Sequence, residues 1–404
     1  MCIISYMIFL FYVFYGIIFI VGDNLKRKKR LKLKKPFVIL LRLIVLILLL
    51  GFFSWCFYLY QINSIKKIGY SREASKNILL SLKKDFVVSV GKNLTLNAAF
   101  ESDDYDENNL DSYSKISYQD QANIIKNINT LIEKGYSNND ISMILAHGND
   151  LEVTEFAQRE KIKYLEEFYS ISYAKLKYYD RYLEYSRETG EDEATTVLYV
   201  NLGMDKEPYT DSNLVKDFSI DMLVNKYNYL IATSGNEAIM LAVSHKPNII
   251  LLDNDETQFG AKVAVESFKK MYHAAAKEGL GLVINSGYRS YEEQEELCEV
   301  YRLLYGDNYV KKYVASPGYS EHQTGLAFDI GSTSSNIFAD SLEYQWMLKN
   351  AHKYGFILRF SKSGETITGF RNEPWHYRYV GEKIATYIYE HNITFEEYYV
   401  EFLA

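Results

Sequence analysis

Two long apolar runs occupy most of the first 60 residues and constrain what this part of the chain can fold into. Residues 3–22 carry no charged side chain, and residues 37–60 are interrupted only by Arg42. A helix needs about 20 consecutive, mostly apolar residues to cross the hydrocarbon core of a bilayer. We therefore predict that residues 1–61 form a membrane anchor with one or two transmembrane helices.

A basic segment separates the two apolar runs and predicts their orientation. Eight of the ten residues 26–35 are Lys or Arg. Such a loop stays on the cytoplasmic side, so everything after Gln61 is expected outside the membrane. A cleaved signal peptide is the alternative, but no small-x-small site closely follows the second run, and Trp55 before Cys56 disfavours a lipoprotein site. The first run could also extend a single signal anchor, so the number of spans stays open.

The remainder of the chain is acidic and poor in cysteine. It carries 36 Lys and Arg against 51 Asp and Glu, whereas residues 1–60 carry nine basic residues and one acid. This balance argues against nucleic acid as a partner. Cys2 lies directly before the first apolar run and Cys56 lies in the second, which leaves Cys298 alone, so neither an intramolecular disulfide framework nor a Cys-based zinc site is possible there. The length of 404 residues leaves room for two or three domains.

Residues 62–220 are polar and predict a mainly helical extracytoplasmic region. The sequence Gly-Tyr-Ser at 69–71 leads to Ile-Leu at 78–79, and the same pattern recurs at 135–137 and 144–145. Ser71 and Ser137 are typical helix N-caps, and Ser137 with Asp140 approximates a capping box. We expect two small helix-turn units in a stalk or packing domain, with a cell-wall binding module as the alternative. The acidic stretch 101–111 is expected to be a linker.

Residues 221–404 contain patterns of both helices and strands and predict an α+β domain. Apolar residues at helical spacing run from Ala264 to Ala275 and end before Gly279, and residues 282–284 are typical of a buried strand. Further helices are expected at 291–305 and from 340 to 354, where Asp340 and Glu343 resemble a capping box. Residues 356–358 and 375–380 are expected strands. Because no βαβ rhythm is present, we predict a small, mostly antiparallel sheet with flanking helices.

Within this domain, the segment 315–329 places a histidine and an aspartate seven positions apart. It ends in an alternating strand, on which Asp329 shares the small-residue face with Ala327. A carboxylate buried alone on such a face is costly, and a cation would remove that cost. With the downstream His376, His322 and Asp329 could make a zinc site whose fourth position is open for water. Glu373 is the candidate base for that water, or else a surface carboxylate paired with Arg371.

Two separated motifs in this region resemble those of a known family. Ser320-x-His322-x-x-Gly325-x-Ala327-x-Asp329, followed by Glu373-x-Trp375-His376, resembles the signature of the LAS metallopeptidases. The chain is most similar to the VanY-type D-alanyl-D-alanine carboxypeptidases, over roughly residues 223–399. The loop at 360–364 departs from the pattern of relatives, which often have a Tyr-Pro pair there.

The resemblance implies a role for each matching position. It implies zinc bound by His322, Asp329 and His376, with Glu373 as the catalytic base. It also implies that Arg289, Gln294 and Ser316 contact the substrate. Taken alone, Arg289 could be an ordinary surface arginine, and Ser316 could be a turn residue ahead of Pro317.

The function implied by the resemblance and the predicted anchor is that of a membrane-bound zinc carboxypeptidase outside the cell. It would remove the terminal D-alanine from peptidoglycan stem peptides, with Zn²⁺ as cofactor. An L,D-carboxypeptidase or a peptidoglycan endopeptidase on the same scaffold is an alternative. A non-catalytic, zinc-stabilised binding module is a third, which the presence of Glu373 and Arg289 disfavours.

Overall fold

The computed structural model describes residues 35–162, 165–210, 213–216, 218–230, 243–244 and 258–404. The chain divides into two compact units, Met1–Ser114 and Lys115–Ala404, and each is described by itself. The first apolar run and most of the basic segment lie outside the described residues, so the prediction of a second membrane span stays a prediction. The domain boundaries predicted at residues 61 and 220 likewise stay predictions.

In the first unit, one long helix covers the second apolar run. Helix α2 spans Lys35–Ile68, and its residues Leu43–Ile68 are long and apolar enough to cross a membrane, by length and composition. Large apolar side chains such as Ile47 and Trp55 are exposed on it. A helix that is apolar on its exposed surface is typical of a lipid-facing segment, although a signal sequence has the same composition.

Short helices follow α2 and pack around small apolar contacts. They are α3 (Arg72–Leu80), α4 (Lys84–Val90), α5 (Leu94–Glu101), η1 (Glu107–Asn109) and α6 (Leu110–Lys115). The Ser71 hydroxyl accepts from the Ala74 N–H, which confirms the predicted N-cap. The linker predicted at 101–111 is wrong in part, because Asp106 caps η1 and the Tyr105 ring stacks on Phe100 with centroids 4.9 Å apart.

The second unit begins with the other half of the helical region. Its elements are α7 (Ile124–Glu133), α8 (Asn138–His147), α9 (Asp150–Gln158), α10 (Glu166–Tyr169), η2 (Leu176–Tyr178), α11 (Tyr179–Thr189) and α12 (Glu193–Leu202). Ser137 and Asp140 form the predicted capping box at the start of α8. The repeat-related Ile78 and Ile144 are both fully buried, each inside its own unit. The region is therefore mainly helical, as predicted.

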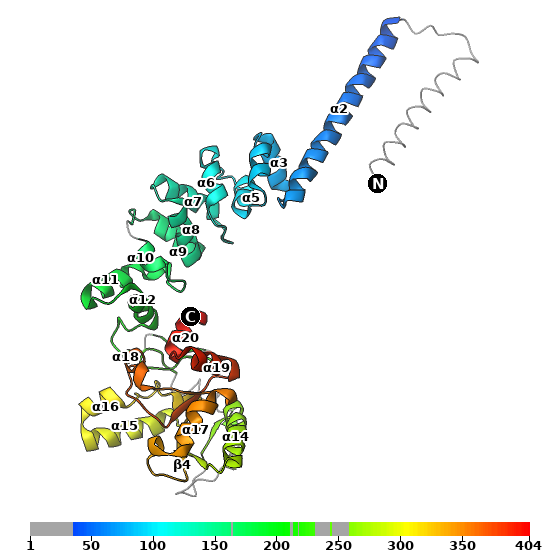
Figure 1. Ribbon diagram of the computed structural model, residues 1–404. Coiled ribbons are helices and arrows are strands. Elements are labelled where there is room, and N and C mark those ends of the chain that lie inside the picture. The colour runs from blue at the N-terminus through cyan, green and yellow to red at the C-terminus, as the bar shows by residue number, and fades with distance from the viewer. Residues whose placement is uncertain (1–34, 163–164, 211–212, 217, 231–242, 245–257) are drawn as a thin grey trace. The chain divides into compact units, whose positions relative to one another are not determined.

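The rest of the second unit is built on a four-stranded sheet (Figure 1). The strands are β3 (Leu282–Ser286), β4 (Ala327–Ser332), β5 (Phe356–Leu358) and β6 (His376–Tyr379), in the spatial order β3-β4-β6-β5. All neighbouring strands are antiparallel. A separate antiparallel pair joins β1 (Val243–Ser244) to β2 (Gly260–Ala261).

Helices flank this sheet, so the fold is α+β as predicted. They are α14 (Lys262–Lys277), α15 (Tyr291–Tyr305), α16 (Asp307–Tyr313), α17 (Leu342–Asn350), α18 (Glu365–Thr368), α19 (Glu382–His391) and α20 (Phe395–Phe402), with the short turns η3 (Glu321–Thr324), η4 (Phe338–Asp340), η5 (Ala351–Tyr354) and η6 (Lys362–Gly364). The predicted apolar stripe of α14 is buried. Its Phe268 ring packs edge-on against Phe328 and Phe356, with centroids 5.9 and 6.2 Å apart.

One local expectation in this domain is wrong. The N-cap of α17 is Ser341, whose hydroxyl accepts from the Tyr344 N–H, and not Asp340. Glu343 instead points into the protein, where it accepts hydrogen bonds from the Gly281 N–H and from the hydroxyls of Ser332 and Ser334. Since these partners come from other segments of the chain, the local pattern could not reveal them.

The pairing of β4 with β6 puts two chemically distinct faces on the sheet. Phe328 pairs with Tyr377 on the face that packs into the core. Asp329 pairs with His376 on the opposite face. Because side chains alternate along a strand, α14 and the apolar core cover one face while polar residues gather on the other.

Candidate active site

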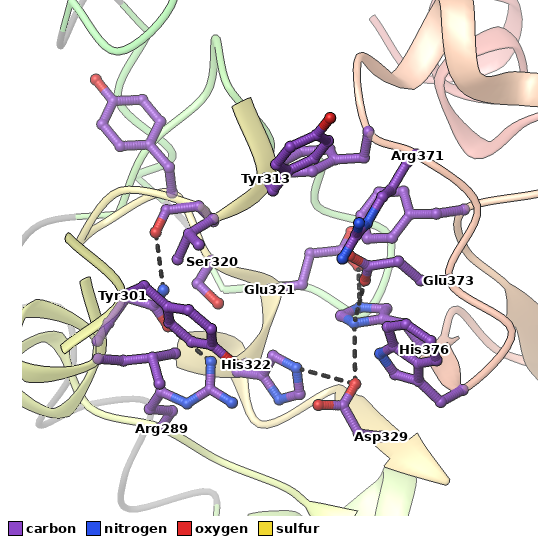
Figure 2. Close-up of a pocket in the computed structure, with 18 of the residues that line it drawn as sticks. Arg289, Tyr301, Tyr313, Ser320, Glu321, His322, Asp329, Arg371, Glu373 and His376 are labelled. Atoms are coloured by element: carbon purple, nitrogen blue, oxygen red, sulfur yellow. Dashed lines mark hydrogen bonds and ion pairs between the residues drawn. The ribbon is translucent and has the colours of Figure 1, made fainter. Parts of the chain in front are cut away.

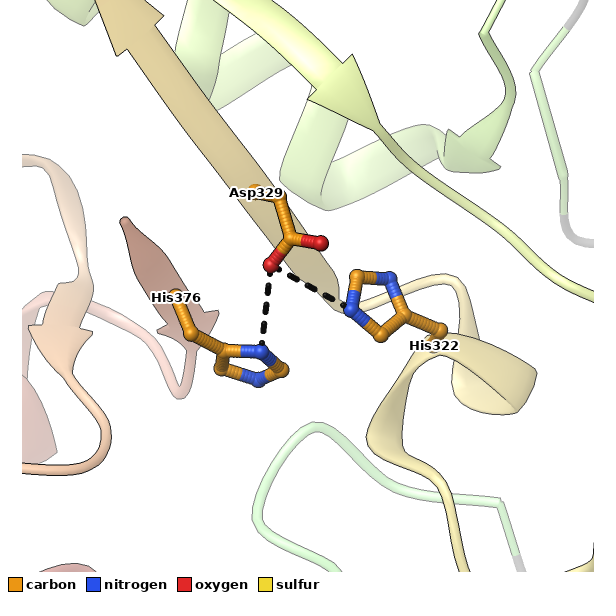
Figure 3. Close-up of side chains that lie close together, drawn as sticks. All are labelled: His322, Asp329 and His376. Carbon is orange, nitrogen blue, oxygen red and sulfur yellow. Dashed lines mark ion pairs between the residues drawn. The ribbon is translucent and has the colours of Figure 1, made fainter. Parts of the chain in front are cut away.

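Three residues from different elements bring possible metal-ligand atoms together on the polar face of the sheet. His322 lies on η3, Asp329 on β4 and His376 on β6, and one ligand atom from each lies within 4.8 Å of the others. Asp329 Oδ1 is 3.4 Å from His322 Nε2 and 3.3 Å from His376 Nδ1, as Figure 3 shows. The structure thus brings together the three residues predicted as ligands.

Backbone geometry explains how residues separated in sequence meet here. Asp329 and His376 are directly paired in the β4–β6 register. His322 is delivered by η3, which turns into β4 at Gly325 with φ of 69°. A Cβ at Gly325 would lie 2.8 Å from the Ala261 nitrogen, so a larger residue would push η3 away from β2.

Each imidazole presents one nitrogen to this point and uses the other in a hydrogen bond. His322 Nδ1 lies 2.7 Å from the Gly287 carbonyl oxygen, to which it donates. In the neutral imidazole, Nε2 of His322 then carries no proton. His376 Nε2 faces Glu321 Oε2 at 3.4 Å, which leaves its Nδ1 directed at Asp329. Fixing one ring nitrogen in this way is how proteins orient metal-binding histidines.

The electrostatics of the three residues fit a bound cation. Burial opposes ionisation, but His322 and His376 hold the pKa of Asp329 well below its usual range. Burial lowers the pKa of His322, which favours its neutral, ligating form. Burial also opposes protonation of His376, but the neighbouring carboxylates of Asp329 and Glu321 raise its pKa to about 9. The site thus attracts positive charge.

An unsatisfied acceptor gives a separate test of that fit. Asp329 Oδ1 is buried and, within the described part of the chain, receives no hydrogen bond of good geometry, despite the two nearby imidazole nitrogens. A buried carboxylate oxygen without a donor is costly. Two imidazole nitrogens and one carboxylate oxygen are also a usual donor set of catalytic zinc. The residues present therefore fit the metal that the resemblance implies.

Glu373 lies beside this cluster, in the loop before β6. Its Oε2 is 3.8 Å from His376 Nδ1, and its side chain is only 16% exposed. Its backbone N–H donates to the Phe360 carbonyl, which holds the loop in place. Burial raises the pKa of Glu373, while His376 opposes the increase. A raised pKa is expected of a carboxylate that both accepts and donates a proton.

The cluster lies in a pocket, shown in Figure 2 with Arg289 on the side of His322 and Glu373 on the side of His376. Arg289 donates to Gln294 Oε1 and Ser286 Oγ, both at 2.8 Å. Among the described residues, no carboxylate forms an ion pair with Arg289. Its guanidinium therefore keeps its charge available to a ligand in the pocket.

The other two predicted substrate contacts differ in their placement. Gln294 lines the pocket, and besides accepting from Arg289 it donates to the Ala315 carbonyl at 2.8 Å. Ser316 is not among the lining residues. Its carbonyl accepts from the Tyr319 N–H in a turn over Pro317 and Gly318, where Gly318 has φ of 88°. A substrate contact by Ser316 stays a prediction.

Sequence reasoning missed an aromatic wall of the same pocket. Tyr301, Tyr309 and Tyr313 line it, and the Arg371 guanidinium lies 4.7 Å from the Tyr313 ring centroid. The recurrence of Tyr at every fourth position from 301 to 313 could have signalled this surface. Glu321 was also missed, although it stands between the motif residues Ser320 and His322.

Comparison with known proteins places these residues in a family. The family model described as VanY, D-alanyl-D-alanine carboxypeptidase, matches residues 259–382. YodJ of Bacillus subtilis, named as a carboxypeptidase, is 37% identical over 201 residues, which cover 46% of this chain and 73% of YodJ. The chain belongs to the VanY family of D-alanyl-D-alanine carboxypeptidases. It is thus a member of a family of carboxypeptidase hydrolases.

Further relatives and solved structures are similar to a part of this chain. A D-alanyl-D-alanine carboxypeptidase of Enterococcus faecalis is 37% identical over 137 residues, covering 32% of this chain and 51% of that protein. The structure of the LdcB LD-carboxypeptidase has 35% identity and a TM-score of 0.42, covering 48% of this chain and 94% of LdcB. VanYB in complex with D-alanine-D-alanine has 31% identity and a TM-score of 0.37, covering 44% and 96%.

The residues matched by the VanY model do not include the whole domain that carries the site. They contain every predicted ligand, base and substrate contact. They exclude residues 218–230, α20 and most of α19. Met222 and Val224 nevertheless belong to the core beneath the sheet, and Phe395 and Val400 to a neighbouring cluster.

Proposed function

We propose that this chain is a zinc-dependent D-alanyl-D-alanine carboxypeptidase that removes the terminal D-alanine from peptidoglycan stem peptides. One observation carries the proposal: the ligand atoms of His322, Asp329 and His376 converge in a pocket that also contains Glu373, which is largely buried, and Arg289, which has no acidic partner among the described residues. The named activity of the Enterococcus relatives supports the choice of substrate.

The metal would be held by His322 Nε2, Asp329 Oδ1 and His376 Nδ1, the atoms that converge. Zinc bound at such a site lowers the pKa of a coordinated water towards about 7 and polarises a carbonyl group. The zinc would not need Glu373 as a ligand, because three protein donors leave one position open to water and substrate. Glu373 is then free to move protons.

Glu373 would act as the general base and then as the general acid. Its carboxylate takes a proton from the water whose oxygen forms the new bond to the scissile carbonyl carbon. The carbon–nitrogen bond then breaks, and the same proton passes from Glu373 to the amine of the departing D-alanine. The raised pKa of Glu373 suits both steps, because a carboxylate with a lower pKa would be a weaker acceptor of the proton from water.

Arg289 would bind the free carboxylate at the end of the stem peptide. Its planar guanidinium matches a carboxylate at two points, and its charge has no acidic partner among the described residues. Ser286 and Gln294 accept hydrogen bonds from the guanidinium and so hold it in position. This contact would select for the last residue of a chain, which is what distinguishes a carboxypeptidase from an endopeptidase.

The proposal includes a location. Helix α2, with the basic segment before it, would anchor the chain in the cell membrane and keep the catalytic domain outside, where peptidoglycan lies. The helical residues 62–220 would then act as a stalk or packing region between the anchor and the domain. The Tyr301–Tyr313 wall would border the part of the stem that precedes the scissile bond.

The test is mass spectrometry of stem peptides incubated with the full chain in detergent, with zinc and with a chelator. We expect the pentapeptide to lose one D-alanine only when zinc is present, and the tetrapeptide to stay intact. Shortening of the tetrapeptide alone would indicate an L,D-carboxypeptidase, and internal cleavage an endopeptidase. Zinc binding without any cleavage would indicate a binding module and refute the proposal.

A further inference from the structure

Glu321 is a buried carboxylate that contacts the candidate metal centre without being one of its ligands. It is 4% exposed and begins η3, immediately before His322. Its Oε1 accepts from Arg359 Nε at 2.8 Å and from Arg378 Nη1 at 3.0 Å. Its Oε2 faces His376 Nε2 at 3.4 Å, on the side of the ring away from Asp329 (Figure 2). Glu321 thus connects two arginines to one histidine.

The two arginines are anchored from outside the residues matched by the VanY model. Arg359 donates from Nη1 and Nη2 to both oxygens of Glu396 on α20, at 2.7 and 2.6 Å. Arg378 donates from Nη2 to the carbonyls of Ile220 and Met222, at 3.2 and 2.9 Å. The chain before the matched region and the helix after it therefore both support Glu321.

This network is costly to bury, and fold stability does not account for it well. Arg359, Arg378, Glu321 and Glu396 are at most 4% exposed, and their formal charges cancel. Replacing such buried ion pairs by apolar side chains is often neutral or stabilising in other proteins. The network is therefore better explained by a functional role than by a contribution to fold stability. It meets the candidate active site at Glu321, which lines the pocket and faces the imidazole of His376.

When neutral His376 ligates a metal through Nδ1, its Nε2 carries the proton and can donate it to an acceptor. Glu321 Oε2 is positioned as that acceptor, and two guanidinium groups hold the Glu321 carboxylate in place. A carboxylate that receives the distal N–H of a ligating histidine fixes both the ring orientation and the tautomer. His322 achieves the same result with the Gly287 carbonyl.

We propose that Glu321 is the positioning residue for His376. We further propose that the buried Arg359–Glu396 and Arg378 contacts make residues 218–230 and α20 parts of the support of the metal centre. The proposal rests on the zinc site of the proposed function. It predicts that the functional unit extends beyond residues 259–382 on both sides, because Glu396 and the carbonyls that bind Arg378 lie outside that range.

The test compares two substitutions of buried glutamates in the full chain. Glu321→Gln weakens the acceptor and removes the charge that the two arginines share. Glu343→Gln makes the same chemical change at a residue that is 1% exposed and accepts hydrogen bonds from Ser332, Ser334 and Gly281, none of which lines the pocket. The zinc dissociation constant of each folded variant is measured by competition with a chelator.

We expect zinc affinity to fall about 10- to 100-fold in Glu321→Gln, the usual range for loss of an outer-shell partner, and to stay near wild type in Glu343→Gln. Glu396→Gln should fall between them, because Arg359 then holds Glu321 less firmly. Equal affinity in Glu321→Gln and wild type would overturn the proposal, as would equal weakening in Glu321→Gln and Glu343→Gln. If Glu396→Gln binds zinc with wild-type affinity, α20 does not support the metal centre.

A second measurement needs no substitution and covers the case in which Glu321→Gln does not fold. Nitrogen-15 NMR of the zinc-loaded wild type should show His376 protonated at Nε2 and bound to metal through Nδ1. Metal at Nε2 of His376 would overturn the proposal. A wild-type chain that binds no zinc would refute the proposed metal site itself, and the inference with it. Zinc binding by the wild type with unchanged affinity in Glu321→Gln would refute the inference alone.

Discussion

Replacing Glu373 by glutamine tests whether this residue acts as a base or as a metal ligand. Glutamine keeps the size of the side chain but cannot accept the proton from water. Glu373 is not one of the residues whose ligand atoms converge, and its nearest carboxylate oxygen is 3.8 Å from His376 Nδ1. Zinc affinity should therefore change little. Turnover should fall about 10²- to 10⁴-fold, the usual contribution of general acid–base catalysis. This is about 3 to 5 kcal/mol of lost transition-state stabilisation.

The assay combines metal analysis of the purified chain with release of D-alanine from a pentapeptide stem. Glu343→Gln serves as the matched control, because it also replaces a buried carboxylate but has its hydrogen bonds on another part of the domain. Near-normal turnover in Glu373→Gln would remove Glu373 from the mechanism. Loss of zinc from Glu373→Gln, with zinc retained in the control, would make Glu373 a ligand instead of a base.

Four further predictions concern a metal ligand, the base, the substrate contact and the location. His376→Ala should lose both zinc and activity, because it removes one of three converging donors, and full zinc content in this variant would exclude His376 as a ligand. Only ionised Glu373 can act as the base, and its pKa is raised. As the pH decreases, kcat/KM should therefore begin to fall above the usual glutamate pKa of about 4.3. A fall that begins only below that pH would contradict the role. Arg289→Lys and amidation of the stem carboxylate should each slow D-alanine release, and their effects should not add fully because both remove one contact; equal rates of wild type on free and amidated stems would favour an endopeptidase. Protease added to intact protoplasts should digest the catalytic domain, and protection of that domain would contradict an extracytoplasmic location.

Local patterns in the sequence predicted the parts of the fold that local contacts determine. The capping of α3 by Ser71 and of α8 by Ser137 follows from interactions over three residues. The buried stripe of α14 follows from helical periodicity alone. The expectation for Asp340 and Glu343 failed for the converse reason, since Glu343 is held by Gly281, which is 62 positions away in the chain.

The candidate site shows the same division between local and distant contacts. The spacing of His322 and Asp329, together with the downstream His376, suggested three ligands that the fold does bring together. The support of that cluster could not be predicted, because Glu321 lies 38 and 57 positions from the arginines that hold it. Ser316, for which the resemblance implies a substrate contact, lies in a turn outside the pocket lining, so that contact stays a prediction.

The most direct test of the central claim is a zinc titration of the chelator-treated full chain, with release of free D-alanine from a pentapeptide stem as the readout. Three converging ligands in one pocket predict no activity without metal and a rise that saturates at about one zinc per chain. Activity that persists after the metal is removed, or zinc that binds without any release of D-alanine, would contradict a zinc-dependent D-alanyl-D-alanine carboxypeptidase.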